Sequence, residues 1–218
     1  MTGNTTTVRH NHIDLALHQL QSGSGRPLLL LHGLGERSPD QIPTDVRGWA
    51  GPVFALDFTG HGASTLPRAG GYTAEILMAD VDAALAHIGP STVVGRGLGA
   101  YIALLISGGR PELVHGAVLT DGGGMAGGST EPTSITVLTS LGRDTTPDPY
   151  ALLELGRDLR PPDYASEYAA VAVAGSLAHP AITVTAQFRP SWLEAVVATR
   201  GVATAASTAA ALAAYAES

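Results

Sequence analysis

The chain has 218 residues, of which 44% are hydrophobic, and this length and composition predict one domain (residues 1–218) around a single buried core. Its net charge is −7 with only 12 lysines and arginines, which argues against a nucleic acid or an anionic membrane as a partner. The lack of cysteine excludes disulfides, thiolate metal sites and a cysteine nucleophile. No apolar run is long enough to span a membrane and no signal-peptide pattern opens the sequence, so we expect a cytoplasmic protein.

The N-terminal part of the chain is predicted to contain strands separated by glycine-rich turns. Residues 1–7 are expected to be a frayed start, and residues 8–21 alternate loosely between apolar and polar, as antiparallel edge strands do. Residues 27–31 are a continuous apolar run, typical of a strand buried on both faces of a parallel sheet. That run ends at His32-Gly33-Leu34-Gly35, and a second buried strand is predicted over residues 52–57.

A helix is predicted over residues 72–88, because its apolar residues lie on one stripe and Thr73 can cap its first turn. The β-branched run 92–94 predicts the next strand, and residues 98–106 carry apolar residues at helical spacing. Between them lie three glycines on alternate positions: Gly95, Gly97 and Gly99. A strand that turns sharply into a helix needs glycines at such positions, because the two backbones pack closely.

The C-terminal half continues the pattern with one interruption. Residues 125–180 begin with a Gly/Ser/Thr-rich stretch and are predicted to form a small helical lid. The other elements predicted here are strands at 114–120, 181–186 and 202–206 and helices at 148–160, 163–177, 190–199 and 208–216. The alternation of strand and helix predicts an α/β protein with a mostly parallel, doubly wound sheet.

Three turns together resemble those of the α/β-hydrolase fold family. His32-Gly33-Leu34-Gly35 resembles its oxyanion-hole loop, and Asp57-Phe-Thr-Gly60-His61-Gly62-Ala-Ser64 resembles its Asp-x-x-Gly-His-Gly-x-Ser turn. Gly95-Arg96-Gly97-Leu98-Gly99 resembles the Gly-x-Ser-x-Gly nucleophile elbow, with Gly97 at the serine position. The order and spacing fit the family from about residue 13 to 124, and the set is more specific than any one turn.

The resemblance implies an oxyanion hole built from the backbone amides of Leu34 and Leu98. It also implies that the catalytic machinery is incomplete. The expected acid position, at about Gln187 or Phe188, holds no acid, and Asp121 is the best remaining candidate because the family also uses that strand end. The expected base position holds Ser207 and Thr208, and no histidine follows His179. The serine–histidine attack of family enzymes therefore cannot be written for this chain.

Arg96 and the histidines leave alternatives open. Arg96 could pair with Asp121, or it could add positive charge beside a helix N-terminus and favour a carboxylate or phosphate. We interpret His32 and His61 as structural hydrogen-bonding residues, while His179 could turn toward the pocket. The edge-strand histidines His10, His12 and His18 show no metal-type partner pattern and are expected to be solvated.

These observations favour a degenerate family member that binds a small carboxylate or carbonyl compound, or a protein partner, with no cofactor and no metal; its oligomeric state is left open. The ligand-binding residues would be Gly33, Leu34, Arg96, Gly97, Leu98 and Asp121. An alternative is an active hydrolase or lyase that uses Asp121 with His32 or His179 and a water. A third hypothesis is a dinucleotide-binding protein, because Gly95-x-Gly97-x-x-Ala100 fits that fingerprint and Asp121 ends the next strand.

Overall fold

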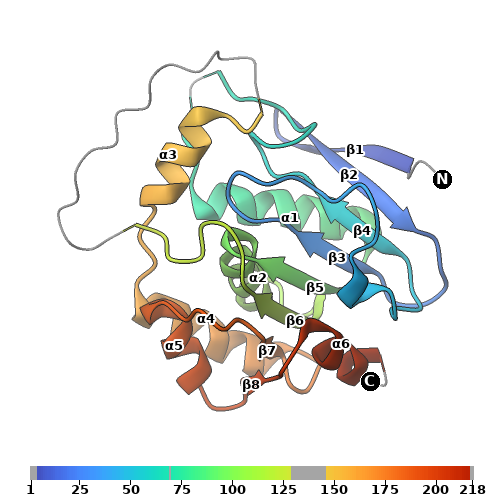
Figure 1. Cartoon of the computed structure of the whole chain (residues 1–218), viewed down its shortest axis with the longest axis vertical. Helices are drawn as coiled ribbons and strands as arrows, with labels where there is room; N and C mark the ends of the chain where they lie inside the picture. The colour runs from blue at the N-terminus through green and yellow to red at the C-terminus, as the bar shows by residue number, and fades with distance from the viewer. Residues whose placement is uncertain (1–3, 69, 129–145, 217–218) are drawn as a thin grey trace.

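The computed structural model describes residues 4–68, 70–128 and 146–216. These residues form one eight-stranded sheet in the order β1-β2-β4-β3-β5-β6-β7-β8 (Figure 1). The strands are β1 (Asn4–His10), β2 (Ile13–Gln21), β3 (Leu28–Leu31), β4 (Val53–Leu56), β5 (Ser91–Arg96), β6 (Val114–Thr120), β7 (Ile182–Val184) and β8 (Ala203–Thr204). The pairs β1–β2 and β2–β4 are antiparallel and all other pairs are parallel. The predicted α/β class is confirmed.

Helices cover both faces of this sheet. They are α1 (Ala74–Ile88), α2 (Leu98–Gly109), α3 (Pro149–Arg157), α4 (Pro162–Gly175), α5 (Ser191–Ala198) and α6 (Thr208–Ala216), with a short 3-10 helix η1 (Thr44–Val46). On one face α2 lies between α1 and α4, and α4 also packs on α5. On the other face α6 packs on η1 and β6. The predicted elements from residue 8 onward are confirmed, with ends that move by a few residues.

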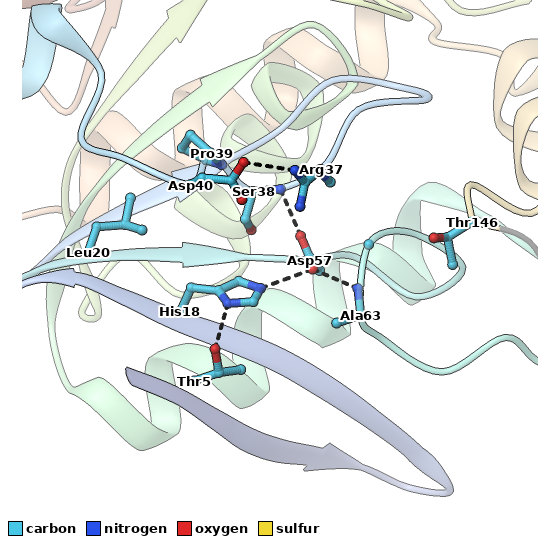
Figure 2. Close-up of a pocket in the computed structure, with 11 residues that line it drawn as sticks. Thr5, His18, Leu20, Arg37, Ser38, Pro39, Asp40, Asp57, Ala63 and Thr146 are labelled. Carbon is cyan, nitrogen blue, oxygen red and sulfur yellow. Dashed lines mark hydrogen bonds and ion pairs between the residues drawn. The ribbon is translucent and has the colours of Figure 1, made fainter. Parts of the chain in front are cut away.

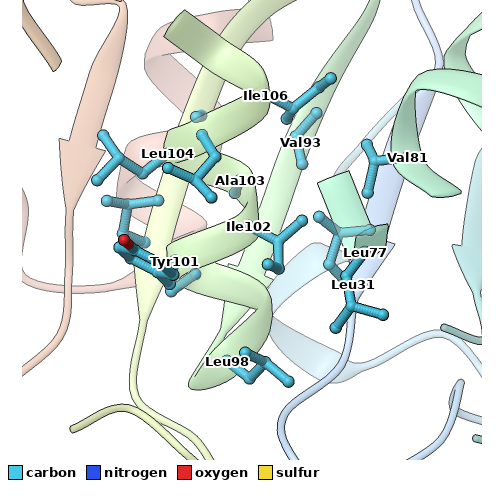
Figure 3. Close-up of a cluster of buried hydrophobic side chains, with 14 of the residues drawn as sticks. Leu31, Leu77, Val81, Val93, Leu98, Tyr101, Ile102, Ala103, Leu104 and Ile106 are labelled. Carbon is cyan, nitrogen blue, oxygen red and sulfur yellow. The ribbon is translucent and has the colours of Figure 1, made fainter. Parts of the chain in front are cut away.

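Helix α2 is the centre of the larger core (Figure 3). Its residues from Leu98 to Gly108 are all buried, because α1 and α4 flank it and the sheet lies beneath it. Strand β3 is buried along its whole length, with Leu29 and Leu31 in this core and Leu28 and Leu30 in the core on the opposite face. Burial on both faces explains why its sequence is apolar at every position.

Two expectations about the fold are wrong in part. Residues 4–7 were expected to be frayed, but they pair with β2 from Asn4 opposite Gln19 onward, a long-range pairing that local sequence does not reveal. The helical lid was placed at about 125–180. Of that range, α3 lies near the carboxyl ends of the strands, where Leu152 approaches Gly35, whereas α4 packs beside α2 and α5. Residues 129–145 lie outside the described part of the chain.

None of the helices described is long and apolar enough to cross a membrane.

Candidate functional site

The turn from β5 into α2 has the backbone geometry of a nucleophile elbow without the nucleophile. Gly97 is the N-cap of α2 and adopts φ +60° and ψ −119°. This conformation costs any residue with a side chain about 1–3 kcal/mol, and glycine adopts it almost freely. A Cβ atom on Gly97 would lie 2.1 Å from the carbonyl oxygen of Gly123. The site therefore has no room for a serine side chain.

The two amides expected to form the oxyanion hole do converge on one oxygen atom. The N–H groups of Leu34 and Leu98 donate to the Gly123 carbonyl oxygen, with N–O distances of 2.9 and 2.8 Å. These are the lengths at which such donors stabilise an oxyanion in an enzyme. The two amides therefore point at one position, and a carbonyl oxygen of the same chain occupies it.

The loop that carries Gly123 follows β6 and is held by hydrogen bonds to the segments that follow β3 and β7. Glu36 accepts a hydrogen bond from the Gly123 amide at 3.4 Å. Asp121, at the start of the loop, accepts from the amides of Gln187 and Phe188 at 2.8 and 3.0 Å. Both oxygen atoms of Asp121 are therefore engaged with backbone after β7, near the position where the family's acid was expected.

The same loop is also held from the helical side. The Nη1 group of Arg160 donates to the carbonyl oxygens of Gly124 and Met125, the latter at 2.7 Å, and the Trp192 indole donates to Met125 at 2.8 Å. Arg160 is 5% exposed and stacks over the Tyr101 ring at 4.9 Å. Burial lowers the pKa of the Arg160 guanidinium to about 10, which is far above neutral pH, so the guanidinium is protonated at neutral pH.

Arg96 pairs with Glu36 and not with Asp121. Its Nε lies 3.0 Å from Oε2 of Glu36, and its Nη2 donates to Oε1 at 3.2 Å. Glu36 also accepts from the Gly33 amide at 3.1 Å. Glu36 was not among the residues predicted for this site. The available signal was its position three residues after Gly33, where a carboxylate can close a tight turn onto that amide.

His32 has no free ring nitrogen. Its Nδ1 donates to the Gly33 carbonyl at 2.8 Å and its Nε2 accepts from the Phe58 amide at 3.1 Å, while the residue is 4% exposed. Burial, together with the neighbouring His61, lowers the pKa of His32 to about 4. His32 is therefore a neutral bridge between two loops, and the geometry gives it no role as a base toward Asp121.

His179 lies at the end of the sheet opposite the elbow. It is exposed and precedes β7, whereas Gly97 and Asp121 follow the carboxyl ends of β5 and β6. Because β6 and β7 are parallel, the start of β7 lies at the edge opposite the elbow. The hypothesis that His179 turns toward the elbow is not supported by this placement.

A cavity of about 200 Å³ opens beside this site at the carboxyl ends of β3, β5 and β6. It lies between β3 and β5, whose following connections run to opposite sides, to β4 and to β6, and such a switch point is where α/β sheets commonly bind ligands. Its polar lining consists of His32, Glu36, Arg37, Asp45, Arg96, Thr120 and Asp121. Within the described residues, no group of three or more His, Asp or Glu side chains is placed to hold a metal ion.

Comparison with known proteins agrees with this architecture. A curated (E)-2-((N-methylformamido)methylene)succinate hydrolase from Acinetobacter baylyi is 28% identical over 107 residues, which are 48% of this chain and 41% of that protein. An uncharacterized protein from Mycobacterium bovis is 34% identical over 107 residues, 48% of this chain and 31% of its own length. The matches thus span about two fifths or less of these relatives.

Similarity of structure extends over nearly the whole chain. The thioesterase domain from the curacin biosynthetic pathway superposes with a TM-score of 0.64 at 13% identity, over 94% of this chain and 92% of that one, which shows the shared fold alone. The model of the alpha/beta hydrolase family matches residues 28–217. The chain therefore belongs to the α/β-hydrolase family.

Proposed function

We propose that this protein does not hydrolyse substrates at its elbow and acts instead as a binding protein built on the hydrolase fold. The Gly123 carbonyl oxygen carries this proposal, because it takes both donors that a tetrahedral intermediate would need. Gly97 adds a second reason, since glycine has no hydroxyl to attack a carbonyl carbon.

Neither of the other hypotheses receives support from the contacts. An active site of Asp121 with His32 or His179 and a water needs a free carboxylate oxygen and a histidine nitrogen facing it. Both oxygens of Asp121 accept backbone amides, both nitrogens of His32 are engaged, and His179 is at the far edge.

Dinucleotide binding through Gly95-x-Gly97-x-x-Ala100 meets a similar objection. It would place a phosphate at the start of α2, where the Leu98 amide already donates to Gly123. The fingerprint also belongs on the first strand of a nucleotide-binding half, whereas β5 follows four earlier strands.

The proposed ligand is a small carboxylate or carbonyl compound that enters the 200 Å³ cavity and contacts Arg96. This guanidinium is 54% exposed and its partner Glu36 is 33% exposed, so a carboxylate ligand could exchange for Glu36 without first being buried. A charge-assisted hydrogen bond of this kind contributes about 1.5–3 kcal/mol. Binding in the oxyanion hole itself would require Gly123 to leave.

Two measurements test the proposal. The first follows hydrolysis of p-nitrophenyl esters and the mass of the tryptic peptide 97–143, which contains the elbow. We expect no acyl adduct on that peptide and no repeated turnover that can be assigned to the elbow. Repeated turnover with an adduct or a saturable rate assigned to this site would overturn the non-hydrolytic reading.

The second measurement follows the melting temperature with a panel of small carboxylates. We expect an increase that Arg96→Ala and raised salt both reduce, and that Arg110→Ala leaves unchanged. Arg110 is a matched control because it is an exposed arginine paired with Asp82 after the last turn of α2, away from the cavity. A panel with no thermal response would favour a protein partner over a small molecule.

A further inference from the structure

A second arrangement of polar residues lies away from the elbow, on the hairpin β1–β2 (Figure 2). The Thr5 hydroxyl on β1 is 2.9 Å from Nδ1 of His18 on β2, and Nε2 of His18 is 3.0 Å from Oδ2 of Asp57 after β4. Residues 1–7 were expected to be frayed and His18 to be solvated. The pairing of β1 with β2 places Thr5 opposite His18, which brings the two side chains together.

The direction of these hydrogen bonds follows from Asp57. Its carboxylate accepts the amides of Ser38 and Ala63 at 2.7 and 2.8 Å in addition to His18. Burial opposes ionisation, but these hydrogen bonds outweigh it and lower the pKa of Asp57. An ionised carboxylate only accepts, so Nε2 of His18 must donate to it. In neutral His18, Nδ1 is then an acceptor and the Thr5 hydroxyl donates to it.

The exposure of the three side chains increases toward a cavity. The Asp57 side chain is 3% exposed and that of His18 is 23% exposed, while Thr5 is an exposed residue. All three line a cavity of about 670 Å³, together with apolar Leu20 and Pro39. A buried acid, a half-buried imidazole and an accessible hydroxyl in series are the arrangement by which hydrolases activate a nucleophile.

We propose that Thr5 is a nucleophile toward small activated carboxylic esters, with His18 as its base and Asp57 as the residue that positions His18. The Thr5 oxygen forms a bond to the acyl carbon while the bond from that carbon to the leaving oxygen breaks. The Thr5 proton passes to Nδ1 of His18 and then to the leaving group. Water, deprotonated by the same nitrogen, cleaves the acyl–threonine ester and restores the hydroxyl, so the steps balance without a cofactor.

The leaving group fits the apolar part of the cavity. Leu20 and Pro39 offer an apolar surface for an aryl group in the cavity that Thr5 also lines. The cation in this cavity, Arg37, is already paired with Asp40 at 2.8 Å, so a neutral ester is favoured over a charged one. The test of this proposal is separate from the test of the proposed function, because Thr5 and the elbow lie on different tryptic peptides, 1–9 and 97–143.

The experiment follows acetylation by p-nitrophenyl acetate, with tryptic digestion and fragmentation of peptide 1–9 to locate the adduct. The chain contains no lysine, so the only competing amine is the one at the N-terminus, which fragmentation separates from Thr5. We expect Thr5 to react at least ten times faster than Thr7, an exposed threonine on the same strand that serves as the internal control. Equal rates at Thr5 and Thr7, or no adduct on Thr5, overturn the proposal.

Three variants separate base assistance from a structural effect. His18→Gln is expected to lower the Thr5 rate by about 10²-fold, since base assistance is worth about 10²–10⁴-fold. Thr5→Ser should keep or raise the rate, whereas Thr5→Val should abolish it, with melting temperatures checked for each variant. A Thr5 rate that is unchanged in His18→Gln contradicts the assignment.

Discussion

The guanidinium of Arg96 and the carboxylate of Glu36 join the end of β5 to the loop after β3, with Nε and Oε2 3.0 Å apart. Arg96 sits immediately before the elbow, and Glu36 also accepts the amides of Gly33 and Gly123. One carboxylate therefore connects three segments that surround the oxyanion hole. The elbow keeps its shape through contacts that have no direct part in catalysis.

Replacing Glu36 with alanine should lower the free energy of unfolding by about 1–3 kcal/mol. This carboxylate accepts two backbone amides and a guanidinium, and hydrogen bonds to charged groups contribute about 1.5–3 kcal/mol before screening. The ion pair adds little, because both side chains are partly exposed. Urea denaturation measures the change. Arg37→Ala, which removes the exposed pair with Asp40, is the control and should change stability by about 0.5 kcal/mol or less. Equal losses in the two variants would contradict this role of Glu36.

Gly97→Ser should destabilise the fold and should not create an esterase at the elbow. The backbone strain alone costs about 1–3 kcal/mol, and the added Cβ meets the Gly123 carbonyl oxygen at 2.1 Å, so the total loss should exceed the strain. Gly48→Ser is the matched control, because Gly48 is exposed and a Cβ there meets nothing within 4 Å. Chemical denaturation and ester hydrolysis assigned to peptide 97–143 are the measurements. A stable Gly97→Ser protein that turns over esters at this peptide would show that a base had been missed.

The elbow and its missing nucleophile were predictable, because glycine spacing and β-branched runs are local signals. The contact of the Gly123 carbonyl oxygen with the Leu34 and Leu98 amides was not. Gly123 acts through a backbone carbonyl, which every residue has, and Gly122-Gly123-Gly124 signals only a turn. Asp121 and Arg96 were identified as important, but their partners come from the segments after β7 and β3. The Thr5–His18 contact was missed for the same reason, since a cross-strand pair appears only when the register is known.

Arg160→Ala should lower the free energy of unfolding by about 2–4 kcal/mol. The variant loses the charge-assisted bonds to Gly124 and Met125 and the stacking on Tyr101. In the native protein, Nε and Nη2 of Arg160 are buried without a hydrogen-bond partner, which costs free energy. The variant no longer bears this cost, so part of the loss is offset. The exposed Arg157 at the end of α3 is the control, and Arg157→Ala should cost about 0.5 kcal/mol or less. Thermal or urea unfolding measures the loss of stability in each variant. Similar losses in the two variants would show that Arg160 does not hold the loop after β6.

Stability should fall as the pH drops from 6.5 toward 4. Burial lowers the pKa of His32 to about 4 in the folded protein, so in this range the unfolded chain binds a proton that the folded chain does not. A difference of this size corresponds to a loss on the order of 3 kcal/mol by pH 4, with no contribution above pH 6.5. Urea midpoints at pH 7 and pH 4.5 measure the effect. His32→Gln should lose less stability over this range, with a remaining slope from His61, whose pKa burial also lowers. An equal slope in both proteins would exclude His32 as its source.

The close approach of Gly97 to Gly123 also limits which residues the two positions accept. A mutation that introduced serine at position 97 would meet the Gly123 carbonyl, and a mutation that added a side chain at Gly123 would place its Cβ 2.6 Å from the carbonyl oxygen of Leu34. A side chain at either position is therefore harmful unless the facing segment moves. The effect of a substitution at one of these positions on stability therefore depends on what stands at its neighbours. The packing of this loop on the elbow therefore favours glycine at both positions, because a side chain at either one meets backbone of a facing segment.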